Sequence, residues 1–353
     1  MPARPPPLGP SLPGRRLALQ RSAAWLAAGP GLGGLTWAGQ DGCTLALAQL
    51  QGGRLAEGAS PACRAPDGGD AVFQAASLAK PVVATLVLKR VQRGELDLDR
   101  PLSEMLPQGY PHRQNLFALR QAPVVDLVPA ELLNTMSVRH LLSHTAGLPN
   151  WADHGPLRPE GRPGERWRYS GEGYVLLQHL LQTLSGLPLQ ALAARELFEP
   201  LGLQRAAFRL TDRLTPALVS GHAADGQGRQ LRFPYEIAAS SLYISSPDYA
   251  RFMAAVLADR GLLDLITTAP VPVPQAPDLR WGLGWALERT AGREAIWHWG
   301  SNPGFRALAM ADLGSKNAVV VLTAAEDGMP RAKALVRQGL PGRHPALEFG
   351  LVQ

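Results

Sequence analysis

Apolar residues alternate with polar ones, or run continuously, in short segments near both ends of the chain. Residues 44–50 and the segment that starts at Leu55 flank the glycine-containing turn 51–54, which predicts a β-hairpin. Three further strand-like segments lie toward the other end, at residues 295–299, 305–311 and 318–323. A helical pattern follows at residues 332–338. These segments predict an antiparallel sheet that is completed by both ends of the chain.

The middle of the chain has a helical pattern instead. Residues 95–280 are mostly apolar segments with helical spacing, broken by proline and glycine, and the clearest are 138–143, 173–184 and 187–198. We therefore predict a mixed α/β (α+β) fold, with a central antiparallel sheet flanked by helices and an inserted all-helical domain. The expected boundaries are 39–95 and 281–345 for a discontinuous α/β domain and 96–280 for the helical insertion.

Residues 1–38 allow two interpretations. Proline-rich residues 1–13 predict a disordered tail. Arg15 and Arg16 then precede a mildly apolar stretch that ends in small residues near Ala38, which is the layout of a twin-arginine export signal. The alternative is a first amphipathic helix over residues 17–27, which Arg21 favours. Export predicts a periplasmic or secreted protein, and the alternative a cytoplasmic one.

The amino-acid composition argues against a nucleic-acid-binding protein and against a membrane protein. The chain has 353 residues, of which 46% are hydrophobic and 18% charged, as in ordinary globular proteins. Its net charge of +6 comes from arginines spread along the chain, which favours a bias in arginine use over a nucleic-acid surface. There is no uninterrupted apolar run of about 18 residues, so no stable membrane insertion is expected. The oligomeric state does not follow from the sequence.

The chain contains two cysteines, Cys43 and Cys63. Pairing across the predicted hairpin places them roughly opposite each other, so a cross-strand disulfide is one expectation, and it requires an oxidising compartment. Two unpaired core thiols are the other expectation.

The motif Ser77-Leu78-Ala79-Lys80, at the start of the apolar run 81–91, carries the strongest chemical signal. Residues three apart on a helix share a face, so the Lys80 amine can lie beside Ser77 Oγ. The apolar surroundings predict burial, and a lysine in a dry cleft loses affinity for its proton and can act as a base. A serine activated in this way is the nucleophile of an acyl-enzyme. The alternative is a solvent-facing pair on a surface helix.

Tyr169 lies in a loop that opens a predicted helix, where a side chain can reach a cleft. Beside a lysine ammonium the pKa of a phenol falls, and the phenolate could then shuttle the serine proton. The alternative is a tyrosine packed beneath the helix.

The segment His298-Trp299-Gly300-Ser301 lies on a predicted strand. Gly300 would let a substrate approach the backbone, and the Ser301 N–H could pair with that of Ser77 as an oxyanion hole. The alternative for His298 is a half-buried strand residue.

Other chemistries lack a motif. His140 and His144 have the i,i+4 spacing of a metal pair, but no third ligand is evident, so no metal site is expected. The nucleophile motif Gly-x-Ser-x-Gly of α/β-hydrolases is absent, and so are the glycine-rich motifs of nucleotide sites. We therefore expect no cofactor.

Together, these motifs resemble the serine β-lactamase-like hydrolases, in the branch of class C β-lactamases, D-alanyl-D-alanine carboxypeptidases and related esterases. The resemblance extends over residues 41–325, and its further segments are 94–99, 141–149, 199–203 and 281–285. It implies that Ser77 is the nucleophile, that Lys80 and Tyr169 are the acid/base pair, and that the Ser77 and Ser301 amides form the oxyanion hole.

Two positions depart from the pattern of that family. Its second motif commonly runs Tyr-x-Asn, but Gly171 stands in place of the asparagine, which removes a partner for a peptide or β-lactam carbonyl. Its third motif commonly begins with lysine, but here with His298, which holds a substrate carboxylate less well at neutral pH. Arg306 could supply a cation instead.

Both departures favour a small-molecule ester as substrate, ahead of D-amino-acid peptides and β-lactams. The expected substrate-binding residues are Gly171, Trp299 and Gly300, and the expected catalytic residues include His298 with Ser77, Lys80 and Tyr169. A penicillin-binding sensor or an inactive relative without turnover is the alternative of another class.

Overall fold

The computed structural model describes residues 43–57, 63–118, 121–152, 155–229, 232–274, 276–290 and 292–352. The tail, export signal or first helix predicted for residues 1–38 lies outside this described part. The described residues all belong to one compact unit.

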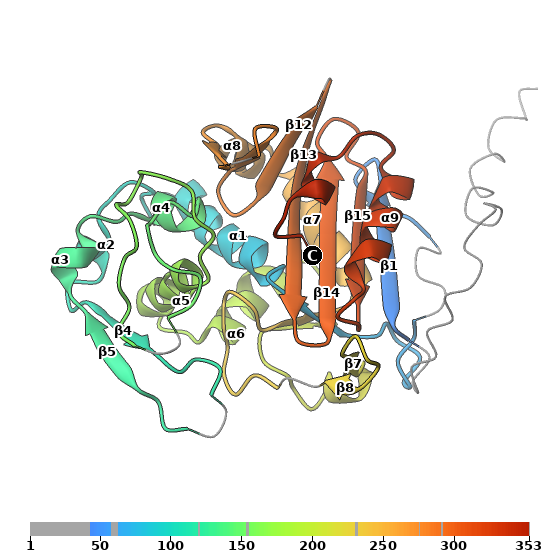
Figure 1. Cartoon of the computed structure of the whole chain (residues 1–353), viewed down its shortest axis with the longest axis horizontal. Helices are drawn as coiled ribbons and strands as arrows, with labels where there is room; N and C mark the ends of the chain where they lie inside the picture. The colour runs from blue at the N-terminus through green and yellow to red at the C-terminus, as the bar shows by residue number, and fades with distance from the viewer. Residues whose placement is uncertain are drawn as a thin grey trace, which may run out of the picture. The chain divides into compact units, whose positions relative to one another are not determined.

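The main sheet has eight strands, and each neighbouring pair is antiparallel. Figure 1 shows β12, β13, β14, β15 and β1 as neighbouring arrows drawn from the two ends of the chain. The order across the sheet is β10 (Val271–Pro272), β11 (Leu279–Trp281), β12 (Ala286–Thr290), β13 (Arg293–Asn302), β14 (Phe305–Asp312), β15 (Ala318–Thr323), β1 (Leu45–Gln51) and β2 (Arg54–Leu55). The predicted central antiparallel sheet is confirmed.

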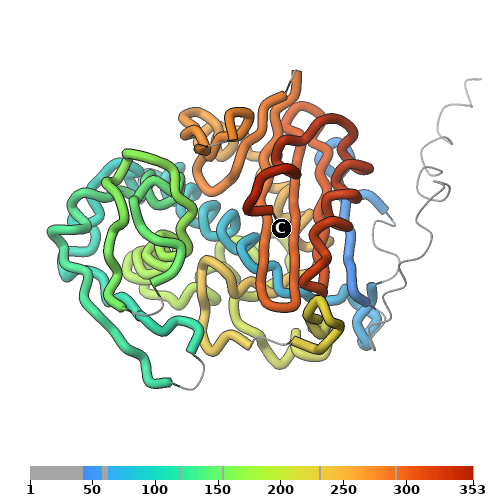
Figure 2. The backbone as a smooth tube through the Cα atoms, in the orientation of Figure 1, coloured from blue at the N-terminus to red at the C-terminus, as the bar shows by residue number. Residues whose placement is uncertain are grey.

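Helices cover both faces of this sheet because its strands are apolar on both sides. Along β15, Val320 and Leu322 belong to one buried cluster, whereas Val319 and Val321 belong to another. The first cluster includes side chains of α7 (Ser246–Ala258), and the second includes side chains of α9 (Met329–Gly339). In Figures 1 and 2, α1 (Ala79–Gln92) runs between the sheet and the helix-rich part of the chain.

The helix-rich part lies within residues 96–280. Its helices are α2 (Leu102–Met105), α3 (Ala130–Leu133), α4 (Val138–Leu142), α5 (Glu172–Ser185), α6 (Leu189–Ala193) with a π-helical turn (Ala194–Phe198), and α8 (Arg260–Thr267). Two short pairs of strands accompany them, β4 (Tyr110–Arg113) with β5 (Val125–Val128) and β7 (Gly221–His222) with β8 (Gly228–Arg229). A further small sheet joins β3 (Phe73–Ala76), β9 (Leu242–Ile244) and β6 (Ala206–Ala207), and short 3₁₀ turns occupy Thr215–Ala217 and Pro345–Glu348.

Two details of the predicted insertion are wrong. The segment is not all-helical, since it contains the β4–β5 ribbon and strands β6 to β9. Its boundary at residue 280 is also too late, because α7 packs against β1 and β15, and β10 belongs to the main sheet. Helical periodicity shows that α7 has an apolar face, but not which element covers that face.

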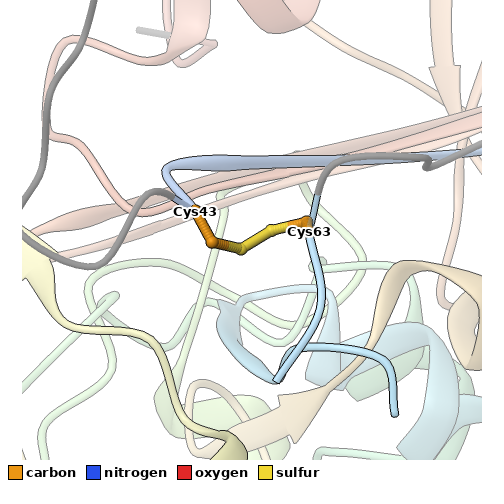
Figure 3. The surroundings of a disulfide bond; sticks show 2 residues. All are labelled: Cys43 and Cys63. Carbon is orange, nitrogen blue, oxygen red and sulfur yellow. A yellow bond between two sulfur atoms is a disulfide. The ribbon is translucent and has the colours of Figure 1, made fainter. Parts of the chain in front are cut away.

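A disulfide joins Cys43 to Cys63, so the expectation of two free thiols is wrong (Figure 3). Their Cα atoms are 5.0 Å apart, and the bond links the residue two before β1 to the segment that follows β2. Within the described residues, none of the helices has the length and apolar character that crossing a bilayer requires.

Candidate active site

Ser77 lies in the turn between β3 and α1. Strand β3 ends at Ala76, which has a left-handed backbone (φ 50°), and a β-bulge between Gln74 and Ala76 alters the register with β9. A left-handed non-glycine residue costs about 1–2 kcal/mol, so the surrounding packing must hold it. The turn leaves Ser77 partly exposed, at the wall of a cavity of about 520 Å³.

The structure brings Lys80 to Ser77 in the geometry that the motif predicts. Lys80 Nζ lies 3.0 Å from Ser77 Oγ and donates to the Ala239 carbonyl at 2.9 Å. The side chain is fully buried in the first turn of α1. Burial holds the pKa of the Lys80 amine well below its ordinary value, because the charged form loses its hydration. Burial thus favours the neutral form of the amine beside the serine hydroxyl.

Tyr169 places its ring beneath this amine, with Lys80 Nζ 4.8 Å from the ring centre. Its hydroxyl is buried and close enough to the Ser77 hydroxyl for the two to interact. Burial raises the pKa of Tyr169 strongly, and the opposing effect of the Ser77 hydroxyl is smaller. The predicted fall in the pKa of Tyr169 is therefore wrong: burial raises that pKa, no charge of Lys80 opposes it, and Tyr169 remains a phenol.

His144 holds the Tyr169 segment on both sides. Its backbone carbonyl accepts from the Arg168 N–H at 2.7 Å, and its Nδ1 accepts from the Ser170 N–H at 3.1 Å. Its ring lies 4.5 Å from that of Tyr169, and its own backbone is left-handed (φ 58°). From the sequence, His144 was considered as half of a metal pair with His140 and as part of the family-like segment 141–149. Neither view predicted this contact, because no local pattern reveals a partner 25 residues away.

We expect the His144→Phe variant to lose about 10- to 100-fold in kcat on an ester substrate, with KM little changed. Phenylalanine keeps an aromatic ring but loses the acceptor that fixes the Ser170 N–H, so Tyr169 shifts relative to Ser77. His144→Asn is the matched variant, because asparagine tolerates a left-handed backbone and its side-chain oxygen can accept the same hydrogen bond. Steady-state kinetics of both variants check this, and equal losses in the two would contradict it.

His298 lies on β13 and is fully buried, not at the cavity wall. Its Nδ1 hydrogen-bonds the Trp299 carbonyl at 2.7 Å, which makes Nδ1 the protonated nitrogen. Burial is the largest cause that lowers the pKa of His298, to about 3, despite the opposing backbone hydrogen bond. A buried neutral imidazole cannot hold a substrate carboxylate.

The remaining predicted residues of β13 divide between cavity and core. Trp299 and Ser301 line the cavity together with Ser77. Gly300 faces the other way, because a Cβ there would lie 2.3 Å from the Ala75 carbonyl oxygen. The prediction that Gly300 admits substrate to the backbone is therefore wrong, and its glycine instead allows β3 to approach the main sheet. That approach brings the residues just before Ser77 directly against β13.

Gly171 is likewise not at the cavity wall, because the Trp151 indole fills the space beside it. Several cavity residues from other segments were not predicted from the sequence. They are Phe117, Asn150, Trp151, Ser240, Asn302, Pro303 and Leu351. Each comes from a loop or an element end, where side-chain periodicity does not indicate direction.

Within the described ranges, no group of three or more His, Cys, Asp or Glu residues is placed to hold a metal ion. His140 Nδ1 accepts from the Ser137 N–H at the start of α4, and His144 Nδ1 accepts from the Ser170 N–H. The two histidines thus serve separate backbone contacts rather than a shared ligand.

A sequence profile of the family described as Beta-lactamase matches residues 33–340, which is most of the chain. The chain belongs to the beta-lactamase family. The predicted resemblance and fold are thereby confirmed.

Relatives within the beta-lactamase family bear different activity names. Penicillin-binding protein 4* of Bacillus subtilis (strain 168) is 23% identical over 315 residues, covering 76% of this chain and 64% of that protein. Esterase EstB of Burkholderia gladioli is 26% identical over 247 residues, covering 55% of this chain and 59% of that protein. The chain thus spans less than two thirds of either relative.

Among solved structures, a D-stereospecific amidohydrolase from Streptomyces superposes with a TM-score of 0.63 at 20% identity, covering 86% of this chain and 96% of that one. At that identity the likeness concerns the fold alone. The beta-lactamase family therefore supplies the architecture, while the substrate class differs among its members.

Proposed function

We propose that this protein is a serine hydrolase that acts through an acyl-Ser77 intermediate, with carboxylic esters as its first substrate class. The observation that carries the proposal is the buried Lys80 amine 3.0 Å from Ser77 Oγ, at the wall of a cavity large enough for a small molecule. A neutral amine in that position can accept the serine proton as the nucleophile attacks.

The reaction proceeds in two steps. Ser77 Oγ bonds to the ester carbonyl carbon while its proton passes to Lys80 Nζ, and the Ser77 and Ser301 N–H groups stabilise the oxyanion. The carbon–alkoxide bond then breaks, and the leaving alkoxide takes a proton from the Tyr169 phenol, which Lys80 resupplies. Water next attacks the acyl group with Lys80 as base, Ser77 Oγ regains a proton, and the carboxylic acid leaves.

The cavity wall favours an uncharged substrate. Among the described lining residues there is no lysine or arginine, and the buried His298 is neutral. Arg306 donates to the backbone carbonyls of Asn302 and Phe305 and is not part of the wall. D-Amino-acid peptides and β-lactams carry a carboxylate that this wall would leave without a cation, which ranks them after esters.

The test is to incubate the protein with p-nitrophenyl acetate and to locate the acyl group by peptide mass spectrometry after an acid quench. We expect release of p-nitrophenol over many turnovers, an acetyl group on the Ser77 peptide, and loss of both in Ser77→Ala. Ser240 provides an internal comparison, since it lines the same cavity without a neighbouring amine contact. Acylation of the Ser240 peptide, or turnover that persists in Ser77→Ala, would contradict the proposal. Acylation by a fluorescent penicillin without turnover of any ester would favour the sensor instead.

A further inference from the structure

The space beside Gly171 is filled by a neighbouring aromatic side chain. A Cβ at position 171 would lie 2.7 Å from Trp151 Cη2, 2.8 Å from Trp151 Cζ2 and 2.7 Å from the Asn150 carbonyl oxygen. No side chain can project there while the indole stays in place. The glycine of the Tyr169-Ser170-Gly171 segment and Trp151 are therefore parts of one arrangement, in which the indole takes the place of a side chain at position 171.

The Trp151 loop is held firmly to the start of α5. Asn150 accepts the Gly171 N–H through both its side-chain and its backbone oxygen, at 2.9 and 3.0 Å. The Ala152 N–H donates to Glu172 Oε1 at 2.9 Å, and that carboxylate is itself buried. The Trp151 ring also packs edge-on against Phe117, with ring centres 4.7 Å apart. A surface held in this way loses little conformational entropy when a ligand binds.

The chemistry of this surface defines what it can bind. Phe117 and Trp151 are only partly buried, and both line the cavity that contains Ser77. Trp299 and Tyr169 add aromatic surface, and the amides of Asn150 and Asn302 add neutral hydrogen-bonding groups. Within the described part of the chain, the lining residues include no charged side chain. Such a wall matches an uncharged aromatic group and offers nothing to an ionic one.

We infer that the Phe117–Trp151 pair is a specificity-determining surface that selects uncharged substrates with an aromatic group on the acyl side of the scissile bond. The part of this inference that concerns hydrolysed substrates rests on the proposed function. The binding of a neutral aromatic amide by the same surface does not depend on turnover.

The kinetic test compares two esters with a common leaving group, p-nitrophenyl phenylacetate and p-nitrophenyl acetate. We expect the unmodified protein to prefer the phenylacetate by about tenfold or more in kcat/KM. Trp151→Ala should lower kcat/KM for the phenylacetate much more than for the acetate, so that most of this preference is lost. Trp151→Phe should restore part of the preference, and Gly171→Asn should reduce it by displacing the indole. Equal losses on both esters in Trp151→Ala would overturn the inference.

The binding test uses Ser77→Ala, in which no acyl-enzyme can form. Isothermal titration should show phenylacetamide binding at least about tenfold more tightly than acetamide, and Trp151→Ala in this background should remove the difference. Equal affinities for the two amides would overturn the inference even where esters are hydrolysed. Selective amide binding without any ester turnover would instead contradict the proposed function and leave the inference standing. Thermal melts of each variant exclude global unfolding as the cause.

Discussion

Replacing Lys80 with methionine should reduce kcat/KM for ester hydrolysis by about 10³-fold or more and yet raise the melting temperature of the protein. Methionine fills a similar volume, but it provides no base for Ser77. Because the proposed mechanism joins Ser77 and Lys80 in one proton transfer, the Ser77→Ala, Lys80→Met and double variants should lose similar amounts of activity. Losses that multiply in the double variant would show that the two residues act independently.

The stability gain in Lys80→Met has a predicted pH dependence. Burial lowers the pKa of Lys80 in the folded state, so the unfolded chain binds a proton that the folded protein does not. Stability must then rise with pH up to the ordinary lysine pKa of about 10.4. The Lys80→Met variant does not bury an amine that must first lose its proton. Its melting temperature should therefore exceed that of the unmodified protein by about 2 °C or more at pH 6, and this difference should shrink toward pH 9.5. Thermal melts of both proteins across that range measure it, and a constant difference would contradict the assignment.

The second large effect concerns the buried charges behind the Trp151 loop. His112 Nδ1 lies 2.8 Å from Asp126 Oδ1, and its Nε2 lies 3.3 Å from Glu172 Oε2, with His112 and Glu172 both almost fully buried. His112→Leu leaves the Glu172 carboxylate without this partner, and we expect a loss of about 3–5 kcal/mol in the free energy of unfolding.

A second substitution, Glu172→Gln in the His112→Leu variant, should recover much of the loss, since glutamine still accepts the Ala152 N–H. Urea unfolding of the four proteins tests this; failure of Glu172→Gln to recover stability would contradict the ion-pair explanation.

This contact also predicts how stability changes with pH. Burial alone lowers the pKa of His112, but the hydrogen bonds and charges of Glu172 and Asp126 outweigh burial, and the net pKa is raised. The stabilisation is therefore complete below the ordinary histidine pKa of about 6.5 and is lost as the pH rises through the raised folded value. His112→Leu should not show this decline between neutral and alkaline pH.

The sequence was sufficient to predict the parts of the fold that depend on local pattern. Strands β13 and β15 and helix α1 lie close to their expected positions, because alternation and motif spacing act over a few residues. The contact between Ser77 and Lys80 was predictable for the same reason, since one helical turn joins them.

What escaped prediction depends on segments that are distant in the chain. The expected fall in the pKa of Tyr169 assumed an ammonium, whereas complete burial lowers the pKa of Lys80 and raises that of Tyr169. From the sequence, Gly171 indicated only the loss of an asparagine side chain. The structure shows that the Trp151 side chain fills the space beside it. Neither result follows from spacing, because both depend on which loops the fold packs together.

The close approach at Gly300 bears on how this protein could be engineered. Any side chain at that position would press on the Ala75 carbonyl and push the Ser77 turn away from Ser301. Substitution of Gly300 would therefore displace Ser77, the proposed nucleophile, and an activity screen would misread this as a lost substrate contact. Mutant libraries that aim to change substrate selectivity are better directed at positions 117 and 151, whose side chains line the cavity from loops outside the main sheet.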